Sequence, residues 1–555
     1  MGEGGSQPTP LSSPLQGEGY LVRPMFDLLI TGGNVADGTG SPAQRADIGV
    51  RAGRIAAVGR LEGREAATTL DATGLLVAPG FIDIHSHSDF TLLVDPRAQS
   101  QAFQGVTTEV VGNCGHGCAP ITDPRRFTGN IYGWTPQTAI TWQSFAGYLE
   151  RLEKSRPAVN VASLAPFGNL RLAAMPETGQ PATPPELRQM SSGLEECLEA
   201  GAWGFSTGLE YPAERVAAER EIVALCKLTA RRGGIYAAHT RNRETHAAEA
   251  VEEAVRTAQE VGVRLQVSHI IPRRGGPPGS IDRCVAAVER AHDRGLDAAF
   301  DSHTRLHGIT NLSNALPSMA FDGGADALRK RLSDPLERAR FRKHESIISS
   351  FALGGWDRVS LYTSPTQPAL KGKSFAEIAA LSAKAVRRDP WEAVFDVLLS
   401  HAEDPHAPLC ICLSYDERDV LRTMRHPLCT IGSDATALAV DGLLSGDTFM
   451  GAFTWAGWFW RRMVVETKFL TPEQAVAKLT SAPADRMGFK DRGRLREGAA
   501  ADIIAFDPAG FREQGTLDSP NRLAEGMRHT VVNGVLTLED GAPTGRRGGH
   551  VLRKA

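Results

Sequence analysis

The stretch Ala78-Pro-Gly-Phe-Ile-Asp-Ile-His-Ser-His-Ser-Asp89 decides how the rest of the chain is interpreted. A Pro-Gly turn leads into a short apolar run, Phe81 to Ile84, which is typical of a buried strand. The run ends on His85 and His87, and residues i and i+2 of a strand face the same side. Both imidazoles can therefore point at one place, which predicts the beginning of a metal site. A chance pair on the surface of an edge strand is the alternative.

The composition is that of a soluble globular protein. With 555 residues the chain can bury a large core and form more than one structural unit. A net charge of −3 favours neither nucleic acid nor an anionic membrane surface as a partner, and no apolar run approaches the ~20 residues of a bilayer span. The eight cysteines lack the spacing of a disulfide framework, so we expect reduced thiols and a cytoplasmic location.

Both ends of the chain differ from its middle in composition and in predicted secondary structure. Residues 1–24 are rich in Gly, Ser, Pro and Gln without a periodic apolar pattern, which predicts a disordered N-terminal extension. Residues 25–79 and 492–555 contain short strand-like runs separated by turns, and Asn533-Gly534 is a hairpin signal. We expect these two segments to form one small composite β-sandwich domain.

Between them, in residues 80–491, strand-like runs alternate with helix-like stretches. The predicted strands after the first are 107–111, 159–164, 204–206, 235–239, 265–269, 298–301, 409–413 and 430–433. This alternation predicts an α/β fold with a closed, parallel (β/α)₈ TIM-like barrel. Helical patterns at 327–349 and 374–388 exceed what a barrel connection needs, so we expect a lid inserted at about 324–402.

Side chains that can bind a metal recur at the ends of the predicted strands. Cys114 and Asp434 each follow such a strand, and His239 and His269 each end one. A small core cysteine, a hydrogen-bonded core histidine and a helix-capping aspartate are the structural alternatives. Because the carboxyl ends of barrel strands form the active-site face, their joint occurrence favours a metal centre shared with the early histidine pair.

The chain resembles the amidohydrolase superfamily and, within it, the N-acyl-D-amino-acid deacylase (D-aminoacylase) group. The motifs that carry the resemblance are Gly80-Phe-Ile-Asp-Ile-His-Ser-His-Ser-Asp89, Gly112-Asn-Cys-Gly115, Phe205-Ser-Thr-Gly-Leu-Glu-Tyr211, His239-Thr-Arg241, Val267-Ser-His269 and Gly432-Ser-Asp434. The cysteine is the discriminating feature, since most members of the superfamily use a carboxylated lysine there. The resemblance implies that Cys114, His239 and His269 hold one Zn²⁺ tightly. It also implies that His85 and His87 contribute to a second, weaker metal position.

The activity that the resemblance implies is hydrolysis of an amide C–N bond. Thiolate and imidazole ligands suit Zn²⁺, which lowers the pKa of a bound water to ~7. Asp434 is expected to take the proton of that water and pass it to the leaving nitrogen. His85 or His87 would help to stabilise the oxyanion. The expected partner is a small-molecule amide, most simply an N-acyl-D-amino acid.

The family pattern changes around the substrate. Members that bind a free carboxylate usually have His-Lys after the second metal histidine, where this chain has Ile270-Ile-Pro272. They typically have Asp-x-Tyr-Pro-Tyr where this chain has Asp301-Ser-His-Thr-Arg305, and an arginine that is missing here from 435–442. A carboxylate held in a pocket needs paired donors, because a buried charge without them is costly.

Two interpretations of these changes stay open. In the first, an anion site is rebuilt from Arg273, Arg274, His303, Arg305 and His307. In the second, the substrate has no free carboxylate there, as in a cyclic amide or a peptide-like compound. A catalytically inactive scaffold is a more distant alternative, which the retention of all the metal-binding residue types disfavours.

Overall fold

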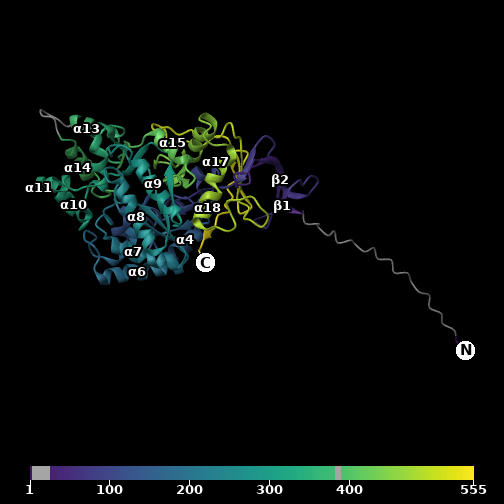
Figure 1. Ribbon diagram of the computed structural model, residues 1–555, viewed down its shortest axis with the longest axis horizontal. Coiled ribbons are helices and arrows are strands. Elements are labelled where there is room, and N and C mark those ends of the chain that lie inside the picture. Colours follow the sequence, from purple (N-terminus) through teal and green to yellow (C-terminus); the bar gives the residue numbers. More distant parts are fainter. Residues whose placement is uncertain (3–24, 382–388, 555) are drawn as a thin grey trace.

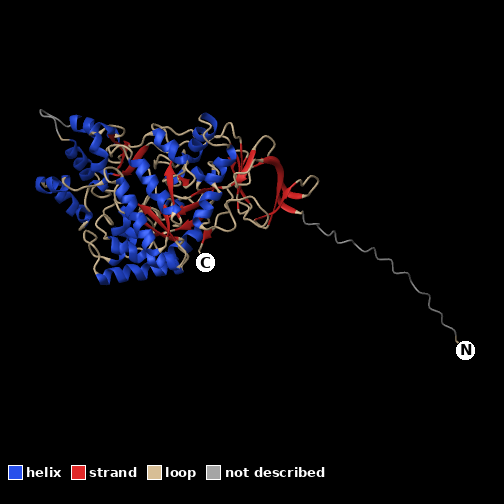
Figure 2. Ribbon diagram, viewed as in Figure 1, coloured by secondary structure: helices blue, strands red, loops and turns tan. Residues whose placement is uncertain are grey.

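The computed structural model describes residues 1–2, 25–381 and 389–554, and shows an α/β protein (Figures 1 and 2). The predicted disordered extension thus lies almost wholly outside the described residues. Along the long axis, β1 (Phe26–Val35) and β2 (Gln44–Arg51) lie at one end, and α10 (Gly324–Ser333) and α11 (Pro335–Arg342) lie at the other. In the described part of the chain, no helix combines the length and apolar character that a membrane crossing requires.

Two parallel sheets occupy the middle of the molecule. The first has the order β6-β7-β8-β22, and the second has the order β9-β10-β11-β12-β13-β17. Their strands are β6 (Phe81–Asp83), β7 (Val106–Val111), β8 (Asn160–Ser163), β22 (Val551–Leu552), β9 (Ala165–Pro166), β10 (Gly204–Gly208), β11 (Ile235–His239), β12 (Arg264–Val267), β13 (Ala298–His303) and β17 (Cys429–Gly432). Only Leu164 separates β8 from β9, and Ser86 and Ala435, just after β6 and β17, form a parallel bridge. The two sheets therefore adjoin at both edges.

Helices join successive strands of these sheets. They include α6 (Pro184–Glu199), α7 (Glu219–Arg231), α8 (Ala247–Val261) and α9 (Ser280–Asp293). Helix α8 buries Val251, Ala254, Val255 and Ala258, which recur at the spacing of one helical face. It ends at Gly262, whose φ of 70° suits a residue without a Cβ atom. Because such helices cover them, β7, β10 and β11 are buried along their whole length.

Both ends of the chain contribute to a nine-stranded sheet. Its order is β21-β20-β19-β18-β5-β1-β2-β3, and β4 also pairs with β1. The remaining strands are β3 (Arg54–Gly59), β4 (Ala66–Asp71), β5 (Leu76–Pro79), β18 (Ile503–Phe506), β19 (Met527–Val532), β20 (Val535–Glu539) and β21 (Ala542–Pro543). The pairing of β5 with β18 joins the two ends, as expected. The predicted hairpin is also present, because Asn533 and Gly534 take φ values of 48° and 78° between β19 and β20.

One expectation for the C-terminal segment is wrong in detail. Strand β22 does not belong to the nine-stranded sheet, although it lies within 492–555. Val551 and Leu552 instead pair in parallel with Val161 and Ala162 of β8. The end of the chain therefore returns to the central strands.

The long segment before β17 has its own antiparallel sheet. Its strands are β14 (His307–Asn311), β15 (Val359–Thr363) and β16 (Leu409–Leu413), in the order β14-β16-β15. The prediction of 409–413 as a strand of the parallel barrel is therefore wrong. Cys410 and Cys412 are buried in a second core with Leu361 instead of in the central core. A short apolar strand has the same sequence pattern in either position.

Helices cover this antiparallel sheet. They are α10, α11, α12 (Ile347–Phe351), α13 (Phe375–Leu381) and α14 (Pro390–Ser400). The helical pattern at 327–349 is divided because Pro335 begins α11, with Asp334 as its cap. The expected helix at 374–388 is described only as far as Leu381. The core of this unit runs from Leu312 to Cys412, beyond the expected limits of 324–402 on both sides.

Candidate metal centre and active site

The six residues predicted to form the metal site and its base converge in the structure. Their potential ligand atoms make two overlapping groups, and the atoms within each group lie within 4.8 Å of one another. The first group is His85, His87, Cys114 and Asp434, and the second is Cys114, His239 and His269. All six side chains are buried. They meet because each lies at the carboxyl end of a strand in the central parallel sheets.

Cys114 lies at the centre of this cluster. Its Sγ atom is 3.2 Å from His85 Nε2 and 3.4 Å from both His239 Nδ1 and His269 Nε2. Burial raises the pKa of the thiol to about 11. The sulfur is therefore protonated at neutral pH unless a cation displaces the proton.

The backbone is strained at three of these residues. Cys114, His269 and Asp434 take φ values of 53°, 35° and 46°, which are unusual for residues with a side chain. Such conformations cost of order 1–3 kcal/mol each and concentrate at functional sites. Here they occur just past strands β7, β12 and β17, where the chain turns.

Two carboxylates orient the histidines. His239 Nε2 donates to Glu210 Oε2 at 2.7 Å, and His85 Nδ1 donates to Asp301 Oδ1 at 3.2 Å. Asp301 Oδ1 also accepts from the backbone N–H of His269 at 2.7 Å. A carboxylate behind a histidine selects which ring nitrogen faces a metal. Glu210 and Asp301 received no role from the sequence, although Glu210 lies within a motif of the resemblance and Asp301 begins the segment where the family pattern changes.

Asp434 is held as an anion by its neighbours. Arg305 Nη2 donates to its carboxylate, and His87 Nε2 donates to Oδ1 at 3.1 Å. Although burial opposes ionisation, the Arg305 charge and the His87 hydrogen bond hold the pKa of Asp434 well below its ordinary value. Its carboxylate is therefore ionised at neutral pH, which a proton acceptor must be before it takes a proton.

Two of the arginines that were predicted to bind an anion lie next to acidic side chains of the protein instead. Arg273 is buried, with Nη1 at 3.0 Å from Glu210 Oε1 and a second ion pair to Glu244. Its charge is therefore already balanced. Arg274 is partly exposed, and its Nη2 lies 3.9 Å from Asp416 Oδ2.

Of the three remaining predicted residues, His303 ends β13, Arg305 follows that strand, and His307 begins β14. Arg305 is committed to Asp434, as described above, and its Nε also donates to the carbonyl oxygen of His307 at 3.1 Å. His307 is half-buried. His303 is buried, and within the described residues neither of its ring nitrogens has a hydrogen-bond partner.

A family model described as "Amidohydrolase family" matches residues 68–316 and 374–538. An N-acyl-D-glutamate deacylase of Alcaligenes xylosoxydans xylosoxydans is 34% identical, over 95% of this chain and 97% of that protein. The chain belongs to the amidohydrolase family. A D-aminoacylase of the same organism is 32% identical to this amidohydrolase, over 95% of the chain and 98% of that protein.

A solved structure of a related deacylase is similar to this amidohydrolase over nearly the whole chain. The N-acyl-D-glutamate deacylase of Bordetella bronchiseptica, complexed with zinc and a phosphonate inhibitor that mimics the tetrahedral intermediate, has a TM-score of 0.78. It is 32% identical, and the similarity covers 95% of this chain and 99% of that chain. Residues 317–373 of this chain lie between the two segments that the family model matches, and they fall within the unit that has its own core.

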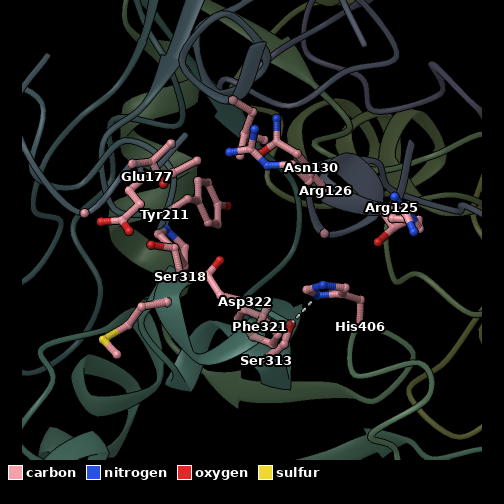
Figure 3. Close-up of a pocket in the computed structure, with 18 of the residues that line it drawn as sticks. Arg125, Arg126, Asn130, Glu177, Tyr211, Ser313, Ser318, Phe321, Asp322 and His406 are labelled. Carbon is pink, nitrogen blue, oxygen red and sulfur yellow. Dashed lines mark hydrogen bonds between the residues drawn. The ribbon is translucent and has the colours of Figure 1, made fainter. Parts of the chain in front are cut away.

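A cavity of about 640 Å³ lies next to the six predicted metal-site residues, which we call the metal group. Figure 3 shows residues that line this cavity. His116 and Tyr211 line it. The ring of Tyr211 is 4.9 Å from that of His239, and the ring of His116 is 6.3 Å from that of His87. His116, which the sequence analysis left without a role, therefore connects the metal group to the cavity.

The opposite wall of the cavity comes from the unit with the second core. Ser318, Phe321 and Asp322 lie there, below Tyr211 in the view of Figure 3. His406 also lines the cavity and is held by Ser313 at 2.7 Å from its Nδ1. A small molecule in this cavity would lie between that unit and the metal group.

Proposed function

We propose that this amidohydrolase is a zinc-dependent deacylase that hydrolyses the amide bond of N-acyl amino acids, most simply N-acyl-D-amino acids. The observation that carries the proposal is the convergence of Cys114 with three histidines beside an ionised Asp434. The full-length similarity to an N-acyl-D-glutamate deacylase and a D-aminoacylase supports the same class of substrate.

The donor set fits Zn²⁺. One thiol and imidazole nitrogens are the ligands that zinc prefers, and the thiol lies within 3.4 Å of both partner nitrogens. Cys114, His239 and His269 would hold one ion, and His85 and His87 would contribute to a second position. A bound zinc supplies a Lewis acid and makes hydroxide available at neutral pH.

The residues of the chain perform the proton transfers. Arg305 binds Asp434 through Oδ2, which leaves Oδ1 directed at the histidine pair. Asp434 Oδ1 is the group that takes a proton from water and delivers it to the leaving nitrogen. Its low pKa keeps it ionised before each turnover.

We also propose that the central strands form a closed (β/α)₈ barrel. The pairing of β6, β7, the β8–β9 pair, β10, β11, β12, β13 and β17 in chain order supports it, as does the bridge between Ser86 and Ala435. Residues 80–491 would make this domain, and 25–79 with 492 to about 550 the composite β-sandwich domain. The lid would extend to about 307–413, the limits of its sheet. All eight cysteines are free, which supports a cytoplasmic location.

The test is amine release from a matched panel by the zinc-loaded protein. The panel holds N-acetyl-D-amino acids, their L enantiomers, carboxamide-capped versions and cyclic amides. We expect the D free acids to be hydrolysed, activity to disappear with a chelator, and Zn²⁺ to restore it. Turnover of capped or cyclic amides alone would favour the second interpretation of the substrate. A zinc-bound protein that hydrolyses nothing would favour an inactive scaffold.

A further inference from the structure

Arg243 is a buried cation whose hydrogen bonds go to backbone carbonyl oxygens. Only 5% of its surface is exposed. Its Nη2 donates to two carbonyl oxygens, of His269 at 2.7 Å and of Ile271 at 3.1 Å. Over the described parts of the chain, it has no ion pair within 4.0 Å, whereas nearby Arg241 pairs with Glu253. A buried guanidinium without a carboxylate is costly, and a bound anion would remove that cost.

His303 is a buried polar group in the same region. It is 1% exposed, and neither ring nitrogen has a partner among the residues described. It lies two positions after Asp301 on β13, so both side chains face the same side of the strand. Asp301 binds His85, and the ring of His303 is 6.4 Å from that of His269. His303 therefore faces the metal group.

Tyr415 brings the two groups together. The guanidinium carbon of Arg243 is 5.6 Å from the centre of the Tyr415 ring. The ring of His303 meets the same tyrosine edge-on, at 4.6 Å. The Tyr415 ring thus contacts both the Arg243 guanidinium and the His303 imidazole, next to the metal group.

We infer that Arg243 and His303, positioned by Tyr415, bind a carboxylate on the amine half of the substrate. This rests on the proposed function and identifies residues for a site that the family pattern does not supply here. The guanidinium provides charge-assisted hydrogen bonds, and the imidazole provides one N–H donor. Of the other basic candidates, Arg273 is occupied by Glu210 and Glu244, and Arg305 by Asp434.

The experiment compares three substrates of nearly equal shape with the zinc-loaded, full-length enzyme. They are N-acetyl-D-glutamate, its α-carboxamide and its side-chain carboxamide. We expect one carboxamide to be hydrolysed much less efficiently than the diacid, which shows which carboxylate the site holds. Arg243→Gln and His303→Phe should each lower kcat/KM for the preferred acid by about 10–100-fold, mainly through KM, because a charge-assisted contact is lost. Turnover of the poorly hydrolysed carboxamide should fall much less than turnover of the acid, because the carboxamide has no charge for these residues to bind.

Controls separate binding from structure. Arg256→Gln, on the exposed face of α8, should change neither substrate preference nor rate. Arg243→Lys should restore part of the preference for the acid, and zinc content should stay at the wild-type level in all variants. Equal losses for acid and carboxamide, or an unchanged preference, would overturn the assignment.

A failure of the proposed function gives a different result. In that case the wild-type enzyme hydrolyses none of the three compounds. The anion site is then tested by calorimetric binding of N-acetyl-D-glutamate and of its diamide. Tighter binding of the acid that disappears in Arg243→Gln and His303→Phe supports the site, and equal binding of both compounds contradicts it.

Discussion

Cys114 has three imidazoles around its sulfur, and two of them, those of His85 and His239, are hydrogen-bonded to carboxylates. At the scale of single residues, the site is therefore a buried donor set whose orientation depends on Glu210 and Asp301. Left-handed backbone at Cys114, His269 and Asp434 completes that orientation. These features make individual roles testable.

The proposed role of Asp434 as proton acceptor predicts the effect of Asp434→Asn. Asparagine keeps the shape but cannot take a proton, so we expect turnover to fall by about 10²–10⁴-fold. Zinc bound through Cys114, His239 and His269 should be retained, as measured by metal analysis of the purified variant. Substantial remaining activity in a folded, zinc-loaded variant would remove Asp434 from this role.

The hydrogen bond from His239 to Glu210 predicts a loss of metal affinity on substitution. Glu210→Gln weakens the hold on the ring, and such partners contribute about 10–100-fold to metal binding. Zinc affinity, measured by competition with a chromogenic chelator, should fall within that range. Glu195→Gln, on an exposed part of α6, makes the same chemical change and should have no effect. An affinity equal to wild type in Glu210→Gln would contradict the orienting role.

At the scale of elements, strand ends decide which side chains meet. Strand β12 ends at Val267, so His269 lies two residues beyond it and is positioned by the Asp301 carboxylate instead of by sheet pairing. Strand β16 lies outside the central core: its Cys410 and Cys412 pack in the second core, and its Ile411 packs in a separate cluster with Ile309 and Tyr362. The unit formed by β14–β16 and helices α10–α14 thus has its own packing.

Packing in the second core predicts how much stability is lost when one of its large side chains is shortened. Leu398 of α14 is fully buried there, so Leu398→Ala should destabilise the unit by about 2–5 kcal/mol. Leu336→Ala, at 80% exposure on α11, should change stability by less than about 0.5 kcal/mol. Urea unfolding of both variants measures the difference. Similar midpoints for the two would show that this core contributes little.

At the scale of the whole molecule, the buried carboxylate of Asp502 connects the nine-stranded sheet to the central strands. Asp502, just before β18, pairs with Arg492 and accepts from Asn160 Nδ2 of β8 at 3.0 Å and from the N–H of Asn533 at 2.7 Å. The composite sheet and the parallel sheets therefore share one polar network.

Loss of this carboxylate should affect global stability. Asp502→Ala removes the buried carboxylate partner of Arg492 and leaves only its 3.3 Å ion pair with the more exposed Asp491, so we expect a loss of up to about 3–5 kcal/mol. Asp540→Ala removes an exposed carboxylate that contacts Arg528 and, at 3.8 Å, His529, and it should cost less than about 1 kcal/mol. The midpoints of chemical unfolding give both values. An Asp502→Ala variant as stable as Asp540→Ala would exclude the network as a structural link.

By itself, the sequence determined the local elements and the types of side chain at strand ends. His85, His87, Cys114, His239, His269 and Asp434 were all recognisable, because each stands next to a short apolar run and such runs have period-2 geometry. The hairpin at Asn533-Gly534 was recognisable for the same local reason, since two adjacent residues must take positive φ.

Only the tertiary structure decided which elements and which charges are partners. The assignment of 409–413 to a separate antiparallel sheet, and of 551–552 to β8, depends on pairing between distant segments. The roles of Glu210, Asp301 and Arg243 depend in the same way on what lies opposite each of them in space. Arg241, Arg243, Arg273 and Arg305 are chemically identical in the sequence. Three of them lie next to a carboxylate, whereas Arg243 donates to backbone carbonyl oxygens, which is why we assign an anion to it.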